Sequence, residues 1–250
     1  MSKITENIAK LQDIIDVSKR IVFFGGAGVS TESGIPDFRS VDGLYHQKYD
    51  YPPETILSHG FFMSKTEEFY KFYSEKILMK GVENRPGPNA AHLKLAELEE
   101  KGKLTAVVTQ NIDGLHQEAG SQTVYELHGS VLRNYCMDCG ASFDLDYMLE
   151  SETIVPHCDK CGGVIKPDVV LYGEGLDPDT MSGAINAIKE ADTLIIGGTS
   201  LVVYPAAGMV DYFKGNYIVL INKGATSHDG MADLLISDSI GEVLGAINVK

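Results

Sequence analysis

Residues 21–39 read IVFFGGAGVSTESGIPDFR. The run Ile21–Phe24 is apolar throughout and enters a glycine turn, which predicts a buried parallel strand followed by a tight loop. Glycines in such a turn let the backbone approach a pyrophosphate, whose charge is favoured by backbone N–H groups. A dinucleotide fingerprint expects a third small residue after Gly26 and Gly28, where Thr31 stands. The turn therefore indicates dinucleotide binding, and a plain glycine-rich strand-to-helix turn is the alternative.

The same pattern recurs further along the chain. Apolar runs at Leu104–Thr109, Thr193–Ile196 and Tyr217–Ile221 each stop at a polar or glycine-rich loop. Helical stretches lie between them, notably Ala90–Lys101 and Thr180–Ala191. Strands that alternate with helices in this way predict an α/β fold with a doubly wound, parallel, Rossmann-like sheet. Ligands of such sheets bind at the carboxyl ends of the strands, so the loops that follow the strands are the candidate site.

Two regions interrupt this alternation. Residues 40–80 are aromatic and helical in character, and residues 130–170 contain all four cysteines. We expect these regions to form a smaller inserted lobe, composed of a helical module (40–80) and a zinc-ribbon module (130–170). The remaining segments, 1–39, 81–129 and 171–250, are expected to form the Rossmann-like dinucleotide-binding domain.

Length and charge limit the function further. A chain of 250 residues suits one large domain with an insertion. Its formal net charge of −14 argues against direct nucleic-acid binding and favours basic partners such as lysine-rich peptides, unless the acidity only aids solubility. No apolar run is long enough to cross a bilayer, and the N-terminus lacks a signal-peptide pattern. We therefore expect a cytoplasmic protein without a membrane partner.

The cysteines form two pairs with the spacing of a zinc ribbon. Cys136 and Cys139 are separated by two residues, as are Cys158 and Cys161, with eighteen residues between the pairs. Four thiolates complete the tetrahedral coordination of Zn²⁺, so the predicted ion is structural. Disulfides are the alternative, but they require an oxidising compartment that nothing in the sequence indicates.

Three polar motifs follow apolar stretches of the chain. The loop Ser33–Arg39 combines a glycine, a proline and a charged pair. It is a candidate for folding over a bound ligand, and a plain surface loop is the alternative. The segment Thr109–His116 begins where a strand ends, so its amides and acid are candidates for binding a ribose or an amide, with helix capping by Asn111 or Asp113 as the alternative. His128 lies just after the short apolar stretch Val124-Tyr125 and is a candidate general base or a structural histidine.

In their order along the chain, these motifs resemble those of one family, the sirtuins of bacterial type. The match extends from Ile21 to Leu244 and also includes Lys166–Glu174, Gly198–Val203 and Ile221-Asn222. The resemblance implies NAD as cosubstrate and an acyl-lysine side chain as substrate. It therefore implies an NAD-dependent protein-lysine deacetylase that gives nicotinamide, O-acetyl-ADP-ribose and free lysine.

The resemblance also implies roles for individual residues. His128 and Asn111 are implied to be catalytic. The implied NAD contacts are Ala27, Thr31, Phe38, Arg39, Gln110, Ile112, Asp113, His128, Gly198, Thr199, Ser200, Asn222 and Ile240. The implied borders of the acyl-lysine channel are Val170, Tyr172 and Val203. Residues 170–174 and 200–203 would pair with the backbone of an acetyl-lysine protein segment as added strands.

The mechanism implied by the resemblance suits these residue types. The acyl oxygen attacks the ribose carbon that nicotinamide leaves, and His128 then acts as general base on a ribose hydroxyl. Three alternatives compete, namely an ADP-ribosyltransferase, a deacylase of longer acyl groups and a non-enzymatic zinc-ribbon module. The presence of Gln110, Asn111, Asp113 and His128 together favours the deacetylase.

One departure from the family pattern bears on the acyl group. Sirtuins that prefer acidic acyl groups resemble one another in a Tyr-x-x-Arg motif, and here Tyr70 is present but Tyr73 replaces the arginine. Without a guanidinium, a buried succinyl carboxylate would lose its hydration and lack a partner. We therefore expect deacetylation to be preferred over desuccinylation.

Overall fold

The computed structural model describes residues 3–38, 43–44, 49–83 and 85–249. Its large sheet contains, in spatial order, β3 (Val124–Glu126), β2 (Leu104–Thr109), β1 (Ile21–Gly25), β7 (Thr193–Gly197), β8 (Tyr217–Ile221) and β9 (Leu234–Ile236). Every neighbouring pair of strands is parallel. The chain order reverses between β1 and β7, which confirms the predicted doubly wound, Rossmann-like sheet.

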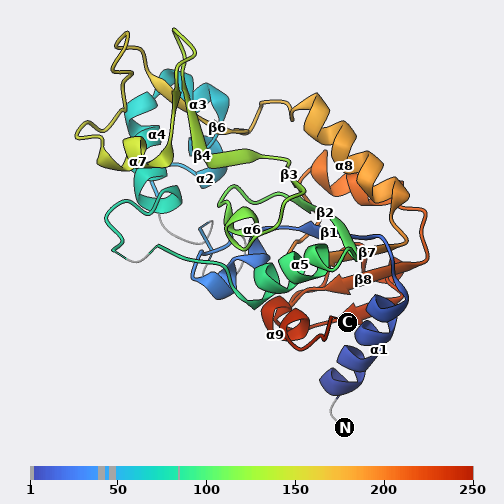
Figure 1. Ribbon diagram of the computed structural model, residues 1–250. Coiled ribbons are helices and arrows are strands. Elements are labelled where there is room, and N and C mark those ends of the chain that lie inside the picture. The colour runs from blue at the N-terminus through green and yellow to red at the C-terminus, as the bar shows by residue number, and fades with distance from the viewer. Residues whose placement is uncertain (1–2, 39–42, 45–48, 84, 250) are drawn as a thin grey trace.

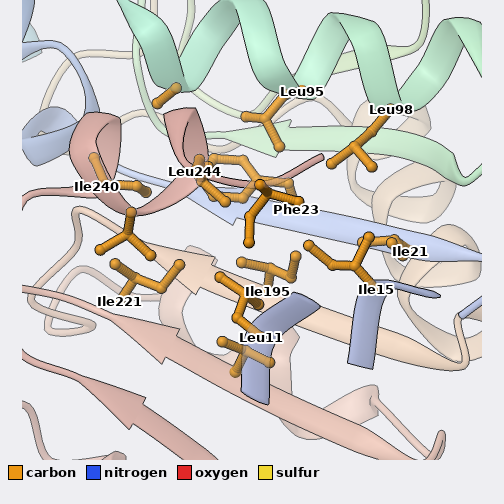
Figure 2. Packing of buried hydrophobic residues seen from close by; sticks show 14 of the residues in the cluster. Leu11, Ile15, Ile21, Phe23, Leu95, Leu98, Ile195, Ile221, Ile240 and Leu244 are labelled. Carbon is orange, nitrogen blue, oxygen red and sulfur yellow. The ribbon is translucent and has the colours of Figure 1, made fainter. Parts of the chain in front are cut away.

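Helices cover both faces of this sheet (Figure 1). The covering helices are α1 (Lys3–Val17), α5 (Ala90–Glu100), α6 (Leu115–Glu118), α8 (Pro178–Glu190) and α9 (Ile240–Gly245). Figure 2 shows side chains of α1, α5 and α9 packed against Ile21 and Phe23 of β1 on one face. Val22 and Phe24 point to the other face, where α8 contributes Ala184 and Ile188. Burial on both faces explains why the strands are continuous apolar runs.

Local signals at the helix ends agree with the structure. The side chain of Asn89 caps α5 by accepting a hydrogen bond from the N–H of Ala91 at 2.9 Å. Asp177 caps α8 by accepting one from Thr180, and Pro178 occupies the first helical position, where its missing N–H costs nothing. Both helices begin within two residues of their predicted starts.

A smaller antiparallel sheet lies beside the large one, at the top of Figure 1. It contains, in spatial order, β5 (Ser142–Phe143), β4 (Gly129–Cys136) and β6 (Ile165–Val169). The helices around it are α2 (Pro53–Ile56), α3 (His59–Ser64), α4 (Thr66–Phe72), a π-helical turn (Tyr73–Ile77) and α7 (Leu145–Glu150). Phe62, Phe69, Tyr70 and Tyr73 form a buried aromatic cluster between these helices and the sheet. Thus segments 53–77 and 129–169 share one core.

Short elements complete the fold. Short 3-10 helices within the described residues include Ala27–Val29, Thr31–Ser33, Ala206–Tyr212 and Asp229–Met231. The last strand, β9, is only three residues long, which is too short to give a periodic signal in the sequence. Among the described residues, no helix has the length and apolar character needed to cross a membrane.

Candidate active site

The strands of the large sheet end at one level. Gly25 of β1 pairs with Thr109 of β2 and with Gly197 of β7. Thr109 also pairs with Glu126 at the end of β3, and Gly197 pairs with Ile221 at the end of β8. The segments that follow β1, β2, β3 and β7 (26–38, 110–114, 127–128 and 198–205) therefore meet at one edge, and we call them the carboxyl-end loops.

The glycine turn after β1 packs directly against the loop after β7. The N–H of Gly28 donates to the carbonyl oxygen of Gly198 at 2.8 Å. A Cβ atom at Gly28 would lie 2.8 Å from that same oxygen, so no larger residue fits there. Gly198 has a φ of +59°, in the left-handed region that glycine adopts without strain. The close approach of two loops requires these glycines, independently of any ligand.

Ser30 connects two residues of the loop after β2. Its hydroxyl donates to Oδ2 of Asp113 at 2.6 Å and accepts from Nδ2 of Asn111 at 3.0 Å. Oδ1 of Asp113 accepts from the N–H of Leu115 at 3.0 Å, so the carboxylate also supports the start of α6. Ser30 is 1% exposed and Asn111 is 8% exposed. Buried polar groups held in this way keep fixed orientations, which binding an amide or a ribose requires.

Ser30 was not among the residues predicted from the sequence to form the site. Its neighbours in the motif, Ala27 and Thr31, were included, but serine at a turn has no spacing relation to residues 111 and 113. The sequence feature that points to Ser30 is its place in the family motif, directly after the glycine turn.

Gln110 connects three of the carboxyl-end loops. Its side-chain Nε2 donates to Oγ1 of Thr199 at 3.0 Å, and its N–H donates to the carbonyl oxygen of Gly25 at 3.0 Å. Its own carbonyl oxygen lies 2.9 Å from Nδ1 of His128. The predicted residues Gln110, Thr199 and His128 are therefore neighbours in space.

The hydrogen bond from His128 to Gln110 sets the state of the imidazole. A carbonyl oxygen only accepts, so Nδ1 of His128 donates and Nε2 is the nitrogen that can receive a proton. Burial lowers the pKa of His128 below its ordinary 6.5, and the hydrogen bond to Gln110 opposes this shift only in part. His128 is therefore a neutral, oriented base at neutral pH.

The predicted substrate segment lies next to His128. The N–H of Val170 donates to the carbonyl oxygen of His128 at 3.0 Å. Tyr172 is 39% exposed, its N–H donates to the carbonyl oxygen of Leu57, and it forms a single parallel bridge with Ser58. The segment that begins at Val170 is thus held between His128 and the helical region around Leu57.

Glu174 anchors the far end of this segment. Its Oε2 accepts from the N–H of Leu171 at 2.9 Å and from Nζ of Lys166 at 3.2 Å, and its Oε1 lies 2.8 Å from Nδ1 of His59. Burial alone would raise the pKa of Glu174, but these donors outweigh it and the pKa is lowered. Glu174 is therefore an anion that fixes the loop.

The remaining predicted residues fall into three groups, namely those with partly exposed side chains, one that is buried and one outside the described residues. Those with partly exposed side chains are Ala27, Thr31, Phe38, Ile112, Ser200, Val203 and Asn222. Ile240 is only 4% exposed and lies in the core (Figure 2). Its side chain occupies the space that a Cβ atom at Gly197 would need. Arg39 lies outside the described residues.

The four cysteines lie together in the smaller lobe. All four Sγ atoms are within 4.8 Å of one another, with 3.4 Å between Cys136 and Cys161 and 3.7 Å between Cys139 and Cys158. A tetrahedral Zn²⁺ with Zn–S bonds of about 2.3 Å places its sulfur ligands roughly 3.8 Å apart. The thiolates therefore fit one zinc ion, as their spacing predicted.

Two histidines are buried behind the loop after β2. His92 of α5 and His116 of α6 are 0% and 1% exposed, and their ring centroids are 4.7 Å apart. Burial, reinforced by the neighbouring His92, lowers the pKa of His116 to about 3. Burial also lowers the pKa of His92, against the attraction of Asp113. Both rings are therefore neutral parts of the core beneath Asp113.

Comparison with known proteins agrees with this geometry. The family model described as Sir2 matches residues 26–205. An NAD-dependent protein deacetylase of Clostridium acetobutylicum is 63% identical over 244 residues, covering 97% of this chain and 98% of the relative. One of Clostridium perfringens is 60% identical over 245 residues, covering 97% and 98%.

Solved structures show the same similarity. A Sir2 protein with a p53 peptide and NAD+ superposes with a TM-score of 0.82 at 40% identity, covering 95% of each chain. A Sir2 protein with a deacetylated p53 peptide and 3′-O-acetyl ADP ribose superposes with a TM-score of 0.85 at 39% identity, again covering 95% of each chain. The likeness therefore extends over nearly the whole of each chain.

Proposed function

This chain belongs to the Sir2 family and is an NAD-dependent protein deacetylase, and we propose that its carboxyl-end loops carry out the reaction. The observation that supports this most directly is the state of His128. Its Nδ1 is committed to Gln110, and burial keeps the ring neutral, so Nε2 can accept a proton. A general base needs both properties at neutral pH.

The donor set of the carboxyl-end loops fits NAD. Carboxamide, hydroxyl and carboxylate groups converge there from Ser30, Gln110, Asn111, Asp113 and Thr199. Such groups suit the ribose hydroxyls and the nicotinamide carboxamide. Ala27, Thr31, Phe38, Arg39, Ile112, Gly198, Ser200, Asn222 and Ile240 complete the proposed NAD contacts. Bound NAD would supply the ribose carbon that the acetyl oxygen attacks as nicotinamide leaves.

In this proposal, some residues of the carboxyl-end loops position the cosubstrate and one accepts a proton. Asn111 and Asp113, held by Ser30, orient the nicotinamide end of the cosubstrate. His128 takes a proton from a ribose hydroxyl and so activates it toward the acetyl carbon. The chain thus supplies a proton acceptor at Nε2 and a fixed geometry around it.

The protein substrate binds beside His128 in this proposal. Val170, Tyr172 and Val203 border the acetyl-lysine side chain, and residues 170–174 and 200–203 pair with its backbone as added strands. The formal charge of −14 favours lysine-rich segments. We also propose a cytoplasmic location and no direct contact with nucleic acid.

The aromatic cluster of the smaller lobe supports the proposal that this protein prefers uncharged acyl groups. The hydroxyl of Tyr70 donates to the carbonyl oxygen of Ile165 and is therefore already engaged. Tyr73, at the position where an arginine would pair with an acidic acyl group, is fully buried. A succinyl carboxylate would be desolvated without a counter-ion. Equal peptides carrying acetyl-lysine or succinyl-lysine test this, and faster removal of succinyl would contradict it.

Incubation with NAD and an acetyl-lysine peptide, followed by mass spectrometry, tests the function itself. We expect nicotinamide and O-acetyl-ADP-ribose in equal amounts, and a His128→Ala variant should lose most of the deacetylation. A peptide that gains ADP-ribose and keeps its acetyl group would instead identify a transferase. Wild-type protein without either product would overturn the proposal.

A further inference from the structure

A single arginine joins the two sheets next to His128. Nη1 of Arg133 lies 2.7 Å from Oε2 of Glu126, and its Nε lies 2.8 Å from Oδ2 of Asp168. These residues come from three strands, with Glu126 on β3 of the large sheet, Arg133 on β4 and Asp168 on β6. Hydrogen bonds between a guanidinium and carboxylates are short and directional, so this triad fixes relative positions of its strands. We call it the Arg133 clamp.

Both partners of Arg133 sit next to proposed active-site residues. Glu126 precedes His128 by two residues, and Asp168 precedes Val170 by two residues. The clamp therefore acts on the two segments that carry the proposed base and the start of the substrate segment. The backbone also joins these segments, through the hydrogen bond from Val170 to His128 at 3.0 Å and the pairing of Gly129 with Val169.

The backbone ladder is interrupted where the clamp lies. β4 and β6 pair at Gly129 with Val169 and resume only at Asn134 with Pro167, with a register shift between them. An advance of five residues along β4 thus corresponds to two residues along β6. Arg133 lies in the part of β4 that has no pairing partner on β6. Irregular pairing of this kind occurs beside active sites, where it re-aims side chains. A side-chain link is the means by which the strands stay aligned across such a gap.

Burial differs among the three residues. The side chain of Glu126 is 9% exposed, whereas those of Arg133 and Asp168 are 44% and 41% exposed. An exposed ion pair contributes little to folding stability. A nearly buried carboxylate is different, because it must find another partner or move toward solvent when its guanidinium is removed. Loss of Arg133 should therefore shift the end of β3, and His128 with it, more than it destabilises the fold.

We propose that Arg133 is a positioning residue for deacetylation, which holds His128 and the substrate segment in register through Glu126 and Asp168. This inference rests on the proposed function. It predicts a specific kinetic pattern, because His128 acts only after nicotinamide has left. Exchange of labelled nicotinamide into NAD, which reverses the first step, should depend less on the clamp than transfer of the acetyl group.

The test compares the two reactions in the full-length protein and its Arg133→Met variant. We expect kcat for deacetylation to fall roughly tenfold, with nicotinamide exchange and the KM for NAD changed by less than about twofold. Arg133→Lys should recover part of the loss, because an ammonium reaches one carboxylate where the guanidinium reaches two. Adding Glu126→Gln to Arg133→Met should cause little further loss, since the two residues act as one unit.

Arg20→Met is the matched control, since Arg20 is exposed and precedes β1 at the opposite end of the sheet. Thermal unfolding and zinc content show whether each variant is folded, and Asp168→Asn provides a milder break if Arg133→Met is unstable. An unchanged deacetylation rate, or an equal fall in both reactions, would overturn the clamp while leaving the proposed function intact. A wild-type protein that performs neither reaction would overturn both.

Discussion

Nδ1 of His128 lies 2.9 Å from the carbonyl oxygen of Gln110. The residues are eighteen positions apart and follow adjacent parallel strands, so the sheet itself brings them together. Because a carbonyl cannot donate, this contact selects the tautomer that carries its proton on Nδ1. The fold thus presents Nε2 of His128 as the acceptor before any ligand binds.

The pH dependence of deacetylation should reflect this buried histidine. Only neutral His128 accepts a proton, and burial lowers its pKa below 6.5. As pH falls, kcat/KM should therefore decline with a midpoint below pH 6.5. Rates measured between pH 5 and 8 with an acetyl-lysine peptide check this. A decline centred above pH 6.5 would contradict the neutral, buried base.

Substitution of Ser30 by alanine should impair the nicotinamide end of the site. The variant removes a donor to Asp113 and an acceptor for Asn111, which leaves the partly buried carboxylate and the buried carboxamide without that partner. We expect kcat/KM for NAD to fall about tenfold or more. Ser64→Ala is the control, because Ser64 is exposed and its hydroxyl donates to the carbonyl oxygen of Gly60 within α3. Equal rates for the two variants would show that Ser30 has no part in the site.

Two glycines with similar backbones should respond differently to alanine. Gly129 has a φ of +75° and Gly140 a φ of +69°, so alanine is strained at both. A Cβ at Gly129 would also overlap the carbonyl oxygen of Asp168, whereas one at Gly140 meets nothing within 4 Å. Gly129→Ala should therefore push β4 from β6 and abolish most activity, while Gly140→Ala stays active. Steady-state rates and melting temperatures of both variants test this prediction, and equal activity in the two variants would contradict it.

The buried histidine pair should make stability fall in acid. His116 keeps a pKa of about 3 when folded, so between about pH 6.5 and 3 the unfolded chain binds a proton that the folded chain does not. The folded pKa is depressed, so stability is complete above pH 6.5 and is lost as pH decreases. The expected slope is roughly 1 kcal/mol per pH unit for this group.

Urea unfolding of wild type and His116→Leu at pH 7 and pH 5 isolates this contribution. Neither ring nitrogen of His116 has a hydrogen-bond partner among the described residues, so leucine removes no hydrogen bond seen there. The stability difference between the two pH values should be smaller for the variant. If both proteins lose stability equally, His116 does not remain neutral in the folded state.

Removal of zinc should lower deacetylation by loosening the strands that lead to the site. Cys136 is the last residue of β4, which starts directly after His128, and Cys161 lies shortly before β6, which leads to Val170. We expect one zinc per chain by elemental analysis. A strong chelator, or Cys139→Ser, should lower the melting temperature and the deacetylation rate together. Full activity in zinc-free protein would show that the metal does not stabilise these strands.

Much of the architecture follows from local patterns in the sequence. The apolar runs at Ile21–Phe24, Leu104–Thr109 and Tyr217–Ile221 are strands, as expected for short apolar segments in a parallel sheet that is covered on both faces. The cysteine spacing likewise predicted the cluster of thiolates. Short elements such as β9 escaped prediction, because three residues contain no period.

The contacts inside the site, in contrast, join residues from separate segments of the chain. Ser30 meets Asn111 and Asp113 across more than eighty residues of chain, and Arg133 meets Glu126 and Asp168 across three strands. Composition and periodicity alone identify which residues are polar and which strands precede them. Which hydroxyl reaches which carboxylate depends on strand order and register, and these are set by packing of the whole core. Local sequence thus specified the strands, the loops and the zinc ligands, while tertiary packing alone selected the partners of each buried polar group.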